Sequence, residues 1–435
     1  MKAIPLALVP FLWVATLPAQ DTTRAPDGVR VILEYQPGVR PGMVVVPGQG
    51  LDSLRSILRR DLDYSDRFEM IALAESSGSA GGDGPFNYGI YKSLGAEFAV
   101  EVVPGAGGVS VRLQDIAQNK VRNQMTVSLP PESDPNFRLE AHRVSDEVTR
   151  WASGTAGMAA SRLLFVAGGR VYRVDSDGEA IAPISPAGVT ALSPVWSPDG
   201  QRIAYTRLEA GRGAVVVHSL ATGANTTAPG SQTALNITPA FAPDGRTLAY
   251  AHSDENGTDI FTSNVVQQCC AQRLTVGRFA DNLSPTYSPD GRRIAFVSTR
   301  SGPPQIYVMA ADGTDPELLA PFDYGATGSS NAPEWSPDGA NVVFHREVSR
   351  APQLFVLDVV RRGLRQFTSA GRNEDPTWAP DGRHIAFISD RSGQRQIWII
   401  DIETGRVRQV RTPGAARLPA WSRRLARPAA TTTTP

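Results

Sequence analysis

The sequence contains very little cysteine: its 435 residues include two, and these are adjacent, Cys269 and Cys270. Adjacent cysteines match no common zinc-site spacing and lack the two-residue gap of a redox motif. A domain of this size folds without disulfides, so we interpret the pair as two thiols or a vicinal disulfide in a surface turn. The five histidines are scattered, and no two of them stand at metal-ligand spacing. The sequence therefore predicts no metal site and no cofactor.

Net charge is also lacking, since Lys and Arg total 43 and Asp and Glu total 43. A balanced chain gives no electrostatic argument for nucleic acid or an anionic membrane surface as the partner. After the first twenty residues, no stretch is apolar enough to span a bilayer. We therefore expect no nucleic-acid partner and no direct membrane insertion.

Motifs for catalysis are absent as well. The sequence G-x-S-x-G, the nucleophile elbow of serine hydrolases, does not occur, and the region before the repeats is too small for an α/β-hydrolase domain. The aspartates that recur do so because a turn recurs, which makes them poor catalytic candidates. We therefore predict no catalytic residues and do not expect an enzyme.

The first twenty residues have the three-part layout of a secretory signal peptide. Lys2 precedes an apolar run from Ile4 to Leu17, and Pro18-Ala19-Gln20 follows. The run is short for a membrane span and two prolines interrupt it, so we prefer cleavage after Ala19 to an uncleaved anchor. This predicts export, with a signal peptide over residues 1–19 and a mobile segment over residues 20–27.

Glycine and proline, in contrast, are plentiful, with 40 and 34 residues, which favours many short strands joined by tight turns. A motif reading PVWSPDG in its first copy occurs five times. Its aspartates lie 45, 46, 48 and 43 residues apart, at Asp199, Asp244, Asp290, Asp338 and Asp381. Pro-Asp-Gly suits a type I turn that ends in a glycine with positive φ. The period is that of a four-stranded blade of a β-propeller.

A sixth copy, PAWSRRL at residues 419–425, keeps the proline, the aromatic residue and the serine but loses the Pro-Asp-Gly turn. We explain the loss by ring closure, because the strand that would follow the turn is already present as RLLFVA at residues 162–167. Pairing of these two segments leaves no open edge. Counting strands in this way predicts six blades over residues 160–425, followed by a disordered tail over residues 426–435.

Residues 28–155 have a different pattern, which predicts a small α/β domain. Leucine and isoleucine at helical spacing predict a helix over 51–68, and further helices are expected over 88–95 and 139–153. Strands are expected at 29–35, 43–48, 69–73, 96–105, 108–117 and 121–129, with a Gly/Ser-rich loop at 75–85. The predicted fold is mainly β, a six-bladed β-propeller closed by pairing of its N- and C-terminal strands and preceded by the small α/β domain.

Three segments resemble the TolB family, periplasmic components of the Tol–Pal envelope system of Gram-negative bacteria. The repeats end in LPAWS at 418–422, the predicted linking helix contains HRVSDEV at 142–148, and residues 29–47 read VRVILE…RPGMVVVP. The resemblance covers nearly the whole mature chain. The WSPDG repeats, which many propellers share, are less specific than these three segments.

The resemblance implies a non-catalytic, monomeric scaffold in the periplasm that supports outer-membrane integrity and cell division. In the family, the mouth of the propeller channel binds the OmpA-like peptidoglycan-associated lipoprotein Pal, and the N-terminal segment binds TolA. The matching N-terminal residues are Val29, Arg30, Val31 and Ile32. The alternative is an exported propeller that binds a cell-wall sugar or peptide and has no Tol–Pal role.

The connections between blades converge on one mouth of the channel, so the residues just before the proline of each innermost strand should lie there. Their amides, hydroxyls and few charges suit a polar partner loop, although they could equally do no more than cap a hydrated channel. The predicted partner-binding residues are Leu192, Ser193, Asn236, Thr238, Asn282, Ser284, Asn331, Glu374, Asp375 and Arg417.

Overall fold

The structure of the chain is a computed structural model that describes residues 40–73, 86–209, 212–230, 234–276, 280–321 and 328–426. From Arg40 onward the chain clusters as one compact unit. The predicted signal peptide, the segment over 20–27, the strand over 29–35, the loop over 75–85 and nearly all of the tail lie outside the described residues. So do the N-terminal site residues Val29, Arg30, Val31 and Ile32.

None of the described helices combines the length and the apolar character needed to cross a bilayer.

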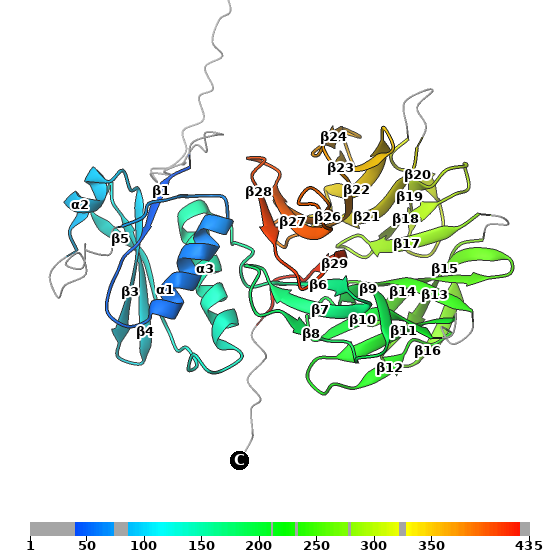
Figure 1. The fold of residues 1–435 in the computed structure, drawn as a ribbon, viewed down its shortest axis with the longest axis horizontal. Coiled ribbons are helices and arrows are strands. Elements are labelled where there is room, and N and C mark those ends of the chain that lie inside the picture. The colour runs from blue at the N-terminus through cyan, green and yellow to red at the C-terminus, as the bar shows by residue number, and fades with distance from the viewer. Residues whose placement is uncertain are drawn as a thin grey trace, which may run out of the picture. The chain divides into compact units, whose positions relative to one another are not determined.

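The N-terminal region contains a five-stranded sheet with the strand order β2-β1-β3-β4-β5 (Figure 1). Its strands are β1 (Gly42–Val45), β2 (Glu69–Met70), β3 (Phe98–Gly105), β4 (Gly108–Asp115) and β5 (Lys120–Val127). β1 pairs in parallel with β2 and β3, whereas β3, β4 and β5 form the predicted antiparallel meander. The strand expected over 69–73 is limited to two residues.

Three helices accompany this sheet: α1 (Asp52–Tyr64), α2 (Tyr88–Ser93) and α3 (Phe137–Ser153). α1 buries an apolar stripe that includes Leu58 and Leu62, as its 3.6-residue period predicts. The stripe belongs to the same hydrophobic core as Val148 of α3. α1 ends before the predicted residue 68, because Asp66 adopts the left-handed conformation with φ 56° and cannot continue a helix.

The remaining strands form the sheets of a β-propeller (Figure 1). One four-stranded sheet has the order β29-β6-β7-β8, from β6 (Arg162–Ala167), β7 (Arg170–Asp175), β8 (Ala182–Pro183) and β29 (Ala416–Trp421). Three more contain β17 (Asn282–Tyr287), β18 (Arg293–Ser298), β19 (Gln305–Ala310) and β20 (Glu317–Leu318); β21 (Ser330–Trp335), β22 (Asn341–Val348), β23 (Ala351–Asp358) and β24 (Leu364–Gln366); and β25 (Asn373–Trp378), β26 (His384–Ser389), β27 (Gln396–Asp401) and β28 (Val407–Val410).

An eight-stranded sheet completes the described part of the propeller. It contains β9 (Thr190–Trp196), β10 (Arg202–Glu209), β11 (Arg212–Ser219), β12 (Asn225–Thr227), β13 (Leu235–Phe241), β14 (Thr247–Asp254), β15 (Gly257–Asn264) and β16 (Cys269–Arg273). Its two halves are joined by one parallel bridge, between Gly213 of β11 and Leu235 of β13.

The first and last strands of the propeller region pair as the sequence predicts. Trp421 of β29 faces Leu163 of β6, and Ala416 faces Ala167, in an antiparallel register. The last strand of the chain therefore lies in the same sheet as the first propeller strand.

The Pro-Asp-Gly motifs form the expected turns. Their five glycines have φ between 66° and 73°, a conformation that glycine adopts without the cost of a side chain. In the turn after β17, Ser288 Oγ donates to Asp290 Oδ1 at 2.6 Å, and the Gly291 N–H donates to the Ser288 carbonyl at 2.8 Å. The residues before the turn pack between sheets, since Trp335 of β21 shares a hydrophobic cluster with Val297 of β18.

Candidate functional site

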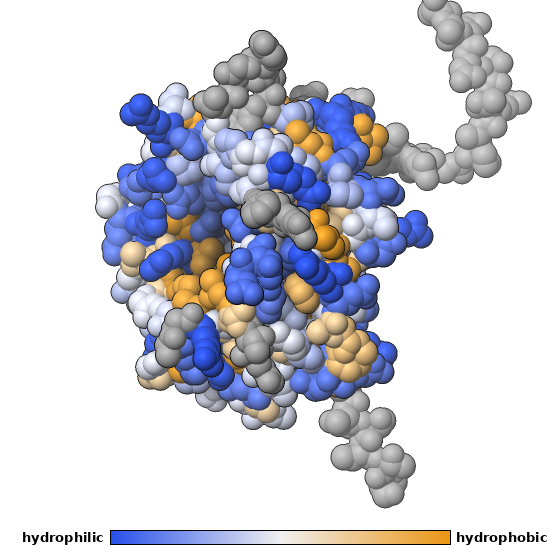
Figure 2. Space-filling view, turned by 90° about the vertical axis from the view of Figure 1, so that its right-hand side faces the viewer, coloured by the Kyte–Doolittle hydropathy of each residue, from blue (hydrophilic) through white to orange (hydrophobic). Residues whose placement is uncertain are grey.

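A cavity of about 740 Å³ is lined by strands β9, β13, β17, β21, β25 and β29 and by the turns that follow them. We call it the central cavity. Figure 2 shows that the face turned toward the viewer is hollowed, with hydrophobic residues inside the hollow and hydrophilic residues around it. Most residues that line the central cavity come from equivalent positions of the repeats, so each repeat contributes a similar part of the wall.

One residue of each of these six strands, immediately before a proline, adopts the left-handed conformation with φ between 48° and 52°. At this residue the strand pairing shifts register, as in a β-bulge. All six residues line the central cavity, and we call them the bulge ring: Ser193, Thr238, Ser284, Ala332, Asp375 and Leu418. Six non-glycine residues in this sparsely populated region mark a strained, repeated feature, and such features concentrate at functional sites.

Four of the ten predicted mouth residues belong to the bulge ring: Ser193, Thr238, Ser284 and Asp375. Ala332 and Leu418 were not predicted, because they occupy the same position of their repeats but are apolar. Position alone identifies them, because each directly precedes the strand proline. The neighbours that were chosen instead, Asn331 and Arg417, are not among the residues that line the cavity.

Two of the predicted mouth residues, Asn236 and Asn282, are both 0% exposed in the structure. Asn236 Nδ2 donates to the Gly213 carbonyl at 3.0 Å, and Asn282 Nδ2 donates to the Thr258 carbonyl at 3.2 Å. The first bond ties the start of β13 to β11, and the second ties the start of β17 to β15. Side-chain alternation alone would place Asn282 on the same face as Ser284, two residues later. The bulge interrupts this alternation, so Ser284 lines the cavity and Asn282 does not.

The remaining predicted residues do not line the central cavity. Leu192 and Asn331 are half-buried, and Arg417 is exposed. Glu374 is half-buried and forms ion pairs with Arg372 at 2.9 Å and with Arg395 at 3.4 Å.

A second ring of cavity residues follows the prolines, at Val195, Ala240, Thr286, Glu334, Thr377 and Ala420. Glu334 is the ring's one ionisable member. Its Oε1 accepts a hydrogen bond from the Trp378 N–H at 3.1 Å, and burial raises the pKa of its carboxyl to about 7. The sequence gives no signal for this residue beyond its place two residues after the bulge.

Asp375 is the ionisable member of the bulge ring. Burial raises the pKa of its carboxyl, although nearby His345 opposes the change. The Asp375 N–H donates to His345 Nδ1 at 3.1 Å, and burial lowers the pKa of that imidazole. The acidic groups of the cavity therefore lie on the neighbouring strands β21 and β25, and the wall is otherwise uncharged at these two rings.

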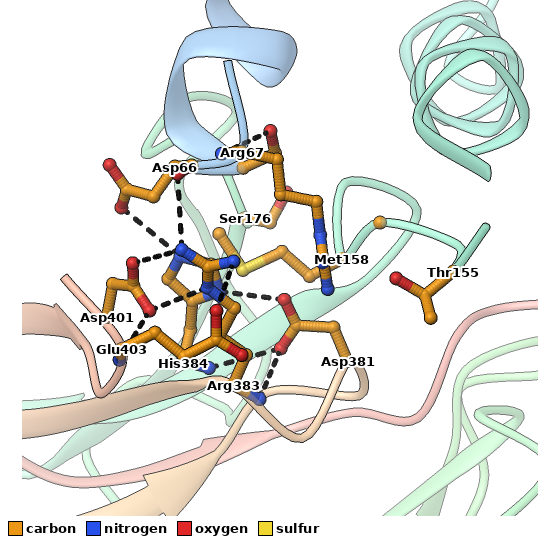
Figure 3. A network of polar contacts seen from close by, with 12 residues as sticks. Asp66, Arg67, Thr155, Met158, Ser176, Asp381, Arg383, His384, Asp401 and Glu403 are labelled. Carbon is orange, nitrogen blue, oxygen red and sulfur yellow. Dashed lines mark hydrogen bonds and ion pairs between the residues drawn. The ribbon is translucent and has the colours of Figure 1, made fainter. Parts of the chain in front are cut away.

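Charged side chains gather instead where the N-terminal region meets the propeller, at His384 in Figure 3. His384 Nδ1 lies 2.7 Å from Asp381 Oδ2, and its Nε2 lies 3.2 Å from Asp66 Oδ2. Arg383 Nε donates to Asp401 Oδ1 at 2.7 Å, and its Nη2 donates to the Asp66 carbonyl at 3.2 Å. Burial lowers the pKa of His384, but Asp381 outweighs it and raises the pKa to about 9.

A second group of charges surrounds His142, the first residue of the HRVSDEV segment. His142 Nδ1 lies 2.7 Å from Asp61 Oδ2 of α1, and its Nε2 lies 3.8 Å from Asp175 Oδ2 of β7. Arg138 of α3 donates to Asp175 at 3.0 Å and to Asp177 at 2.6 Å. Burial lowers the pKa of His142, but Asp61 and Asp175 together raise it to about 10. We call these two groups the junction network.

The same segment contacts the start of the propeller through Asp146. Its carboxylate accepts hydrogen bonds from the Ala159 N–H at 2.7 Å and from the Ala160 N–H at 3.0 Å. Burial raises the pKa of Asp146 to about 6 despite these bonds. The family-like motif thus contacts α1, β7 and the approach to β6 from one helix.

The residues after β29 explain why the sixth repeat lacks its turn. The Arg162 N–H donates to Ser422 Oγ at 2.9 Å, and the Leu425 N–H donates to the Ala160 carbonyl at 2.8 Å. Arg424 Nε donates to the Gly157 carbonyl at 2.7 Å. The chain therefore continues along the junction between the two regions and does not turn back into a further strand.

Two clusters of the junction network have the geometry to hold a metal ion: Asp61, His142 and Asp177, and Asp66, His384 and Asp401. In both clusters arginine already contacts the carboxylates, through Arg138 and Arg60 in the first and through Arg383 and Arg406 in the second. A divalent ion would have to displace these guanidinium groups. The donor sets therefore fit arginine better than they fit a metal.

Comparison with known proteins gives a family for the propeller region and a similar fold for most of the chain. Residues 152–323 and 324–427 match the family described as TolB beta propeller domain. The Tol-Pal system protein TolB of Alcanivorax borkumensis is 28% identical over 263 residues, which are 57% of this chain and 58% of the relative. The protein of the same name from Methylococcus capsulatus is 32% identical over 196 residues, 42% of this chain and 46% of the relative. The chain spans about half the length of the curated relatives it matches.

Among solved structures, TolB from Acinetobacter baumannii is similar, with a TM-score of 0.75 and 23% sequence identity. The match covers 89% of this chain and 98% of that one. At this identity the likeness concerns the fold. Because the match covers more of the chain than the propeller alone, the likeness includes the N-terminal region.

Proposed function

We propose, because the chain belongs to the TolB β-propeller family, that it acts as a non-catalytic periplasmic scaffold of the Tol–Pal system. Its curated relatives carry the name Tol-Pal system protein TolB. The arrangement of the cavity supports a binding role, since Glu334 and Asp375 are held by backbone N–H groups of neighbouring strands. These bonds position the two carboxyl groups in the cavity wall.

We further propose that the propeller has six blades. The eight-stranded sheet divides into β9–β12 and β13–β16 at the single bridge between Gly213 and Leu235. Each half then has four strands, like the other four sheets. The pairing of β29 with β6 supports a ring closed by its first and last strands.

An OmpA-like, peptidoglycan-associated lipoprotein is the proposed partner of the central cavity. The observation that carries this proposal is the bulge ring, whose six strained residues face one cavity of about 740 Å³. Four of the six present no charge and small side chains, Ser193, Thr238, Ser284 and Ala332. Such a wall has room for an inserted loop of the partner and offers hydroxyl groups to its backbone.

Binding of the lipoprotein's soluble domain, measured by calorimetry, tests this proposal. Ser284→Trp should fill part of the cavity and weaken binding at least tenfold. Val360→Trp is the matched control, because Val360 is 86% exposed in the turn after β23. Equal affinity of the two variants would argue against the cavity as the site. Binding of muropeptides or glycan fragments in place of the lipoprotein would favour the alternative function, a propeller that binds a cell-wall sugar or peptide.

The N-terminal segment with Val29, Arg30, Val31 and Ile32 is proposed to bind TolA. This proposal is supported by the resemblance of the segment to the first strands of TolB-family proteins. Val31→Asp should weaken binding of the soluble TolA domain at least tenfold and leave lipoprotein binding unchanged. If the variant binds TolA with the same affinity as the parent chain, this part of the proposal is wrong.

A further inference from the structure

Cys269 and Cys270 form a disulfide on β16, and they are the two cysteines of the chain. Neither therefore has another intramolecular partner. β16 is the last strand in the order of its sheet, so among the strands that the structure describes none pairs with its outer edge in that sheet (Figure 1). Cys270 is exposed and Cys269 is half-buried, which leaves the sulfurs open to attack by a thiolate from solvent.

The disulfide lies in an irregular part of the strand pairing. Thr262 of β15 faces Gln272, and Asn264 faces Cys269. Two residues of β16, including Cys270, thus oppose one residue of β15, which is the definition of a β-bulge. Bulges of this kind increase local twist and leave one residue without a ladder partner.

The backbone around the bulge is strained. Gln268 has φ 54° and Cys270 has φ 67°, so Cys269 is flanked by two non-glycine residues in the left-handed region. Such residues persist only where the surrounding structure holds them in place. The peptide between the two cysteines belongs to the ring that the disulfide closes, and this ring restrains Cys270.

The other end of β16 is held separately. Asp259 of β15 forms an ion pair with Arg273 and accepts from Thr275 Oγ1 at 2.7 Å. Thr275 Oγ1 in turn accepts from the Ile260 N–H at 2.9 Å. Opening of the disulfide ring should therefore loosen the cysteine end of β16 and leave the Arg273 end paired.

We propose that Cys269 and Cys270 are a reversible thiol–disulfide modification site that controls the order of the β16 edge. In the oxidising step, one thiolate attacks an external disulfide and forms a mixed disulfide, and the second cysteine displaces the remaining thiol. The balance is two protein thiols plus R–S–S–R giving the protein disulfide plus two R–SH, with the two electrons taken by the external disulfide. The site is independent of the proposed partners of the cavity.

The first test is mass spectrometry of the folded full-length chain with oxidised glutathione and with a dithiol. After exposure to oxidised glutathione and removal of excess reagent, N-ethylmaleimide should add to neither cysteine. After treatment with dithiothreitol without denaturant, it should add to both. Two reactive thiols after the oxidising arm, or an unreduced disulfide after the reducing arm, would overturn the proposal.

The second test is hydrogen exchange on the same samples. Reduction should speed amide exchange at residues 268–272 at least tenfold and change exchange at Arg273–Thr275 less than twofold. Cys269→Ser/Cys270→Ser should exchange like the reduced chain. Cys269→Ser/Cys270→Gly, which allows positive φ without a ring, should stay close to the oxidised chain. Equal exchange in the oxidised, reduced and double-serine samples would contradict a role of the ring in ordering this edge.

Discussion

The junction network and the central cavity differ in how many charged side chains they contain. At the junction, Arg383, His384 and Asp401 are each 3% exposed or less, and every one contacts a group of opposite charge. In the two rings of the cavity, Glu334 and Asp375 are the ionisable members among twelve positions. Breaking a buried charge pair costs far more than perturbing a neutral wall. Charge therefore fixes how the two regions meet. The cavity has few charged groups, namely the two acids of its rings and Arg423 and Arg424 after β29, and it remains open to a partner.

The largest expected effect comes from removing a junction carboxylate. Asp401→Ala removes the bidentate partner of Arg383, although Arg383 Nη1 still pairs with Glu403 at 2.7 Å, and should lower the free energy of unfolding by about 3 kcal/mol. Urea denaturation measures this loss. Glu317→Ala is the matched control, since its ion pair with Arg362 at 2.9 Å is exposed, and it should cost about 0.5 kcal/mol. If both variants lose a similar free energy of unfolding, the buried ion pairs of the junction are no more important for stability than exposed ones.

A dependence of stability on pH should follow from His384, whose pKa is raised to about 9. The folded state then binds a proton more tightly than the unfolded state, so the stabilisation is complete below pH 6.5 and is lost as the pH rises to 9. His384 should contribute a fall of about 1.4 kcal/mol per pH unit to the free energy of unfolding in this window, and His142, whose pKa is raised to about 10, should contribute a similar fall. His384→Gln should therefore remove about half of the slope, and His218→Gln should leave it unchanged. A parent chain with constant stability from pH 7 to 9 would contradict the buried imidazolium.

The segment after β29 gives a smaller effect at the same junction. Arg424 donates to the Gly157 and Ala156 carbonyls at 2.7 Å and 3.0 Å. Arg424→Ala should lower the midpoint of thermal unfolding, with a loss of about 1–2 kcal/mol. Arg423→Ala, at an exposed neighbour, should change stability by less than about 0.5 kcal/mol. A larger loss of stability in Arg423→Ala than in Arg424→Ala would show that this segment does not stabilise the junction.

The smallest effect is expected inside the cavity. Burial raises the pKa of Glu334 from 4.5 to about 7, so the charged form weakens the fold as the pH rises through this window. Glu334→Gln removes the charge and should increase stability at pH 8 by about 1 kcal/mol, with no gain at pH 4. Chemical denaturation at the two pH values checks this. A loss at pH 8 would mean that the carboxylate has a stabilising partner in the wall.

Local pattern was enough to predict most of the fold. Pro-Asp-Gly favours a turn by its own conformational preferences, and the motif recurs at a period that is visible in the sequence. The strands on either side of each turn could therefore be predicted. The pairing of residues 162–167 with residues 416–421 was also predictable, because the sixth repeat lacks only its turn. The TolB-like segments correctly indicated the family.

The sites were harder to predict, because they depend on register and on contacts between distant residues. The bulge turns one residue of each innermost strand toward the cavity, so Ser284 lines it while Asn282, two positions earlier, is buried. Ala332 and Leu418 carry no polar signal. The contact between Asp66 and His384 joins residues 318 positions apart, and no local pattern announces it.

Photo-crosslinking to the lipoprotein's soluble domain tests most directly that the central cavity is the partner site. Benzoylphenylalanine placed at Ser284 in the bulge ring and at Val360 on the outer turn gives the comparison. The account predicts a crosslinked product from Ser284 that unlabelled lipoprotein competes away, and none from Val360. Crosslinking from Val360 alone, with none from Ser284, would contradict it.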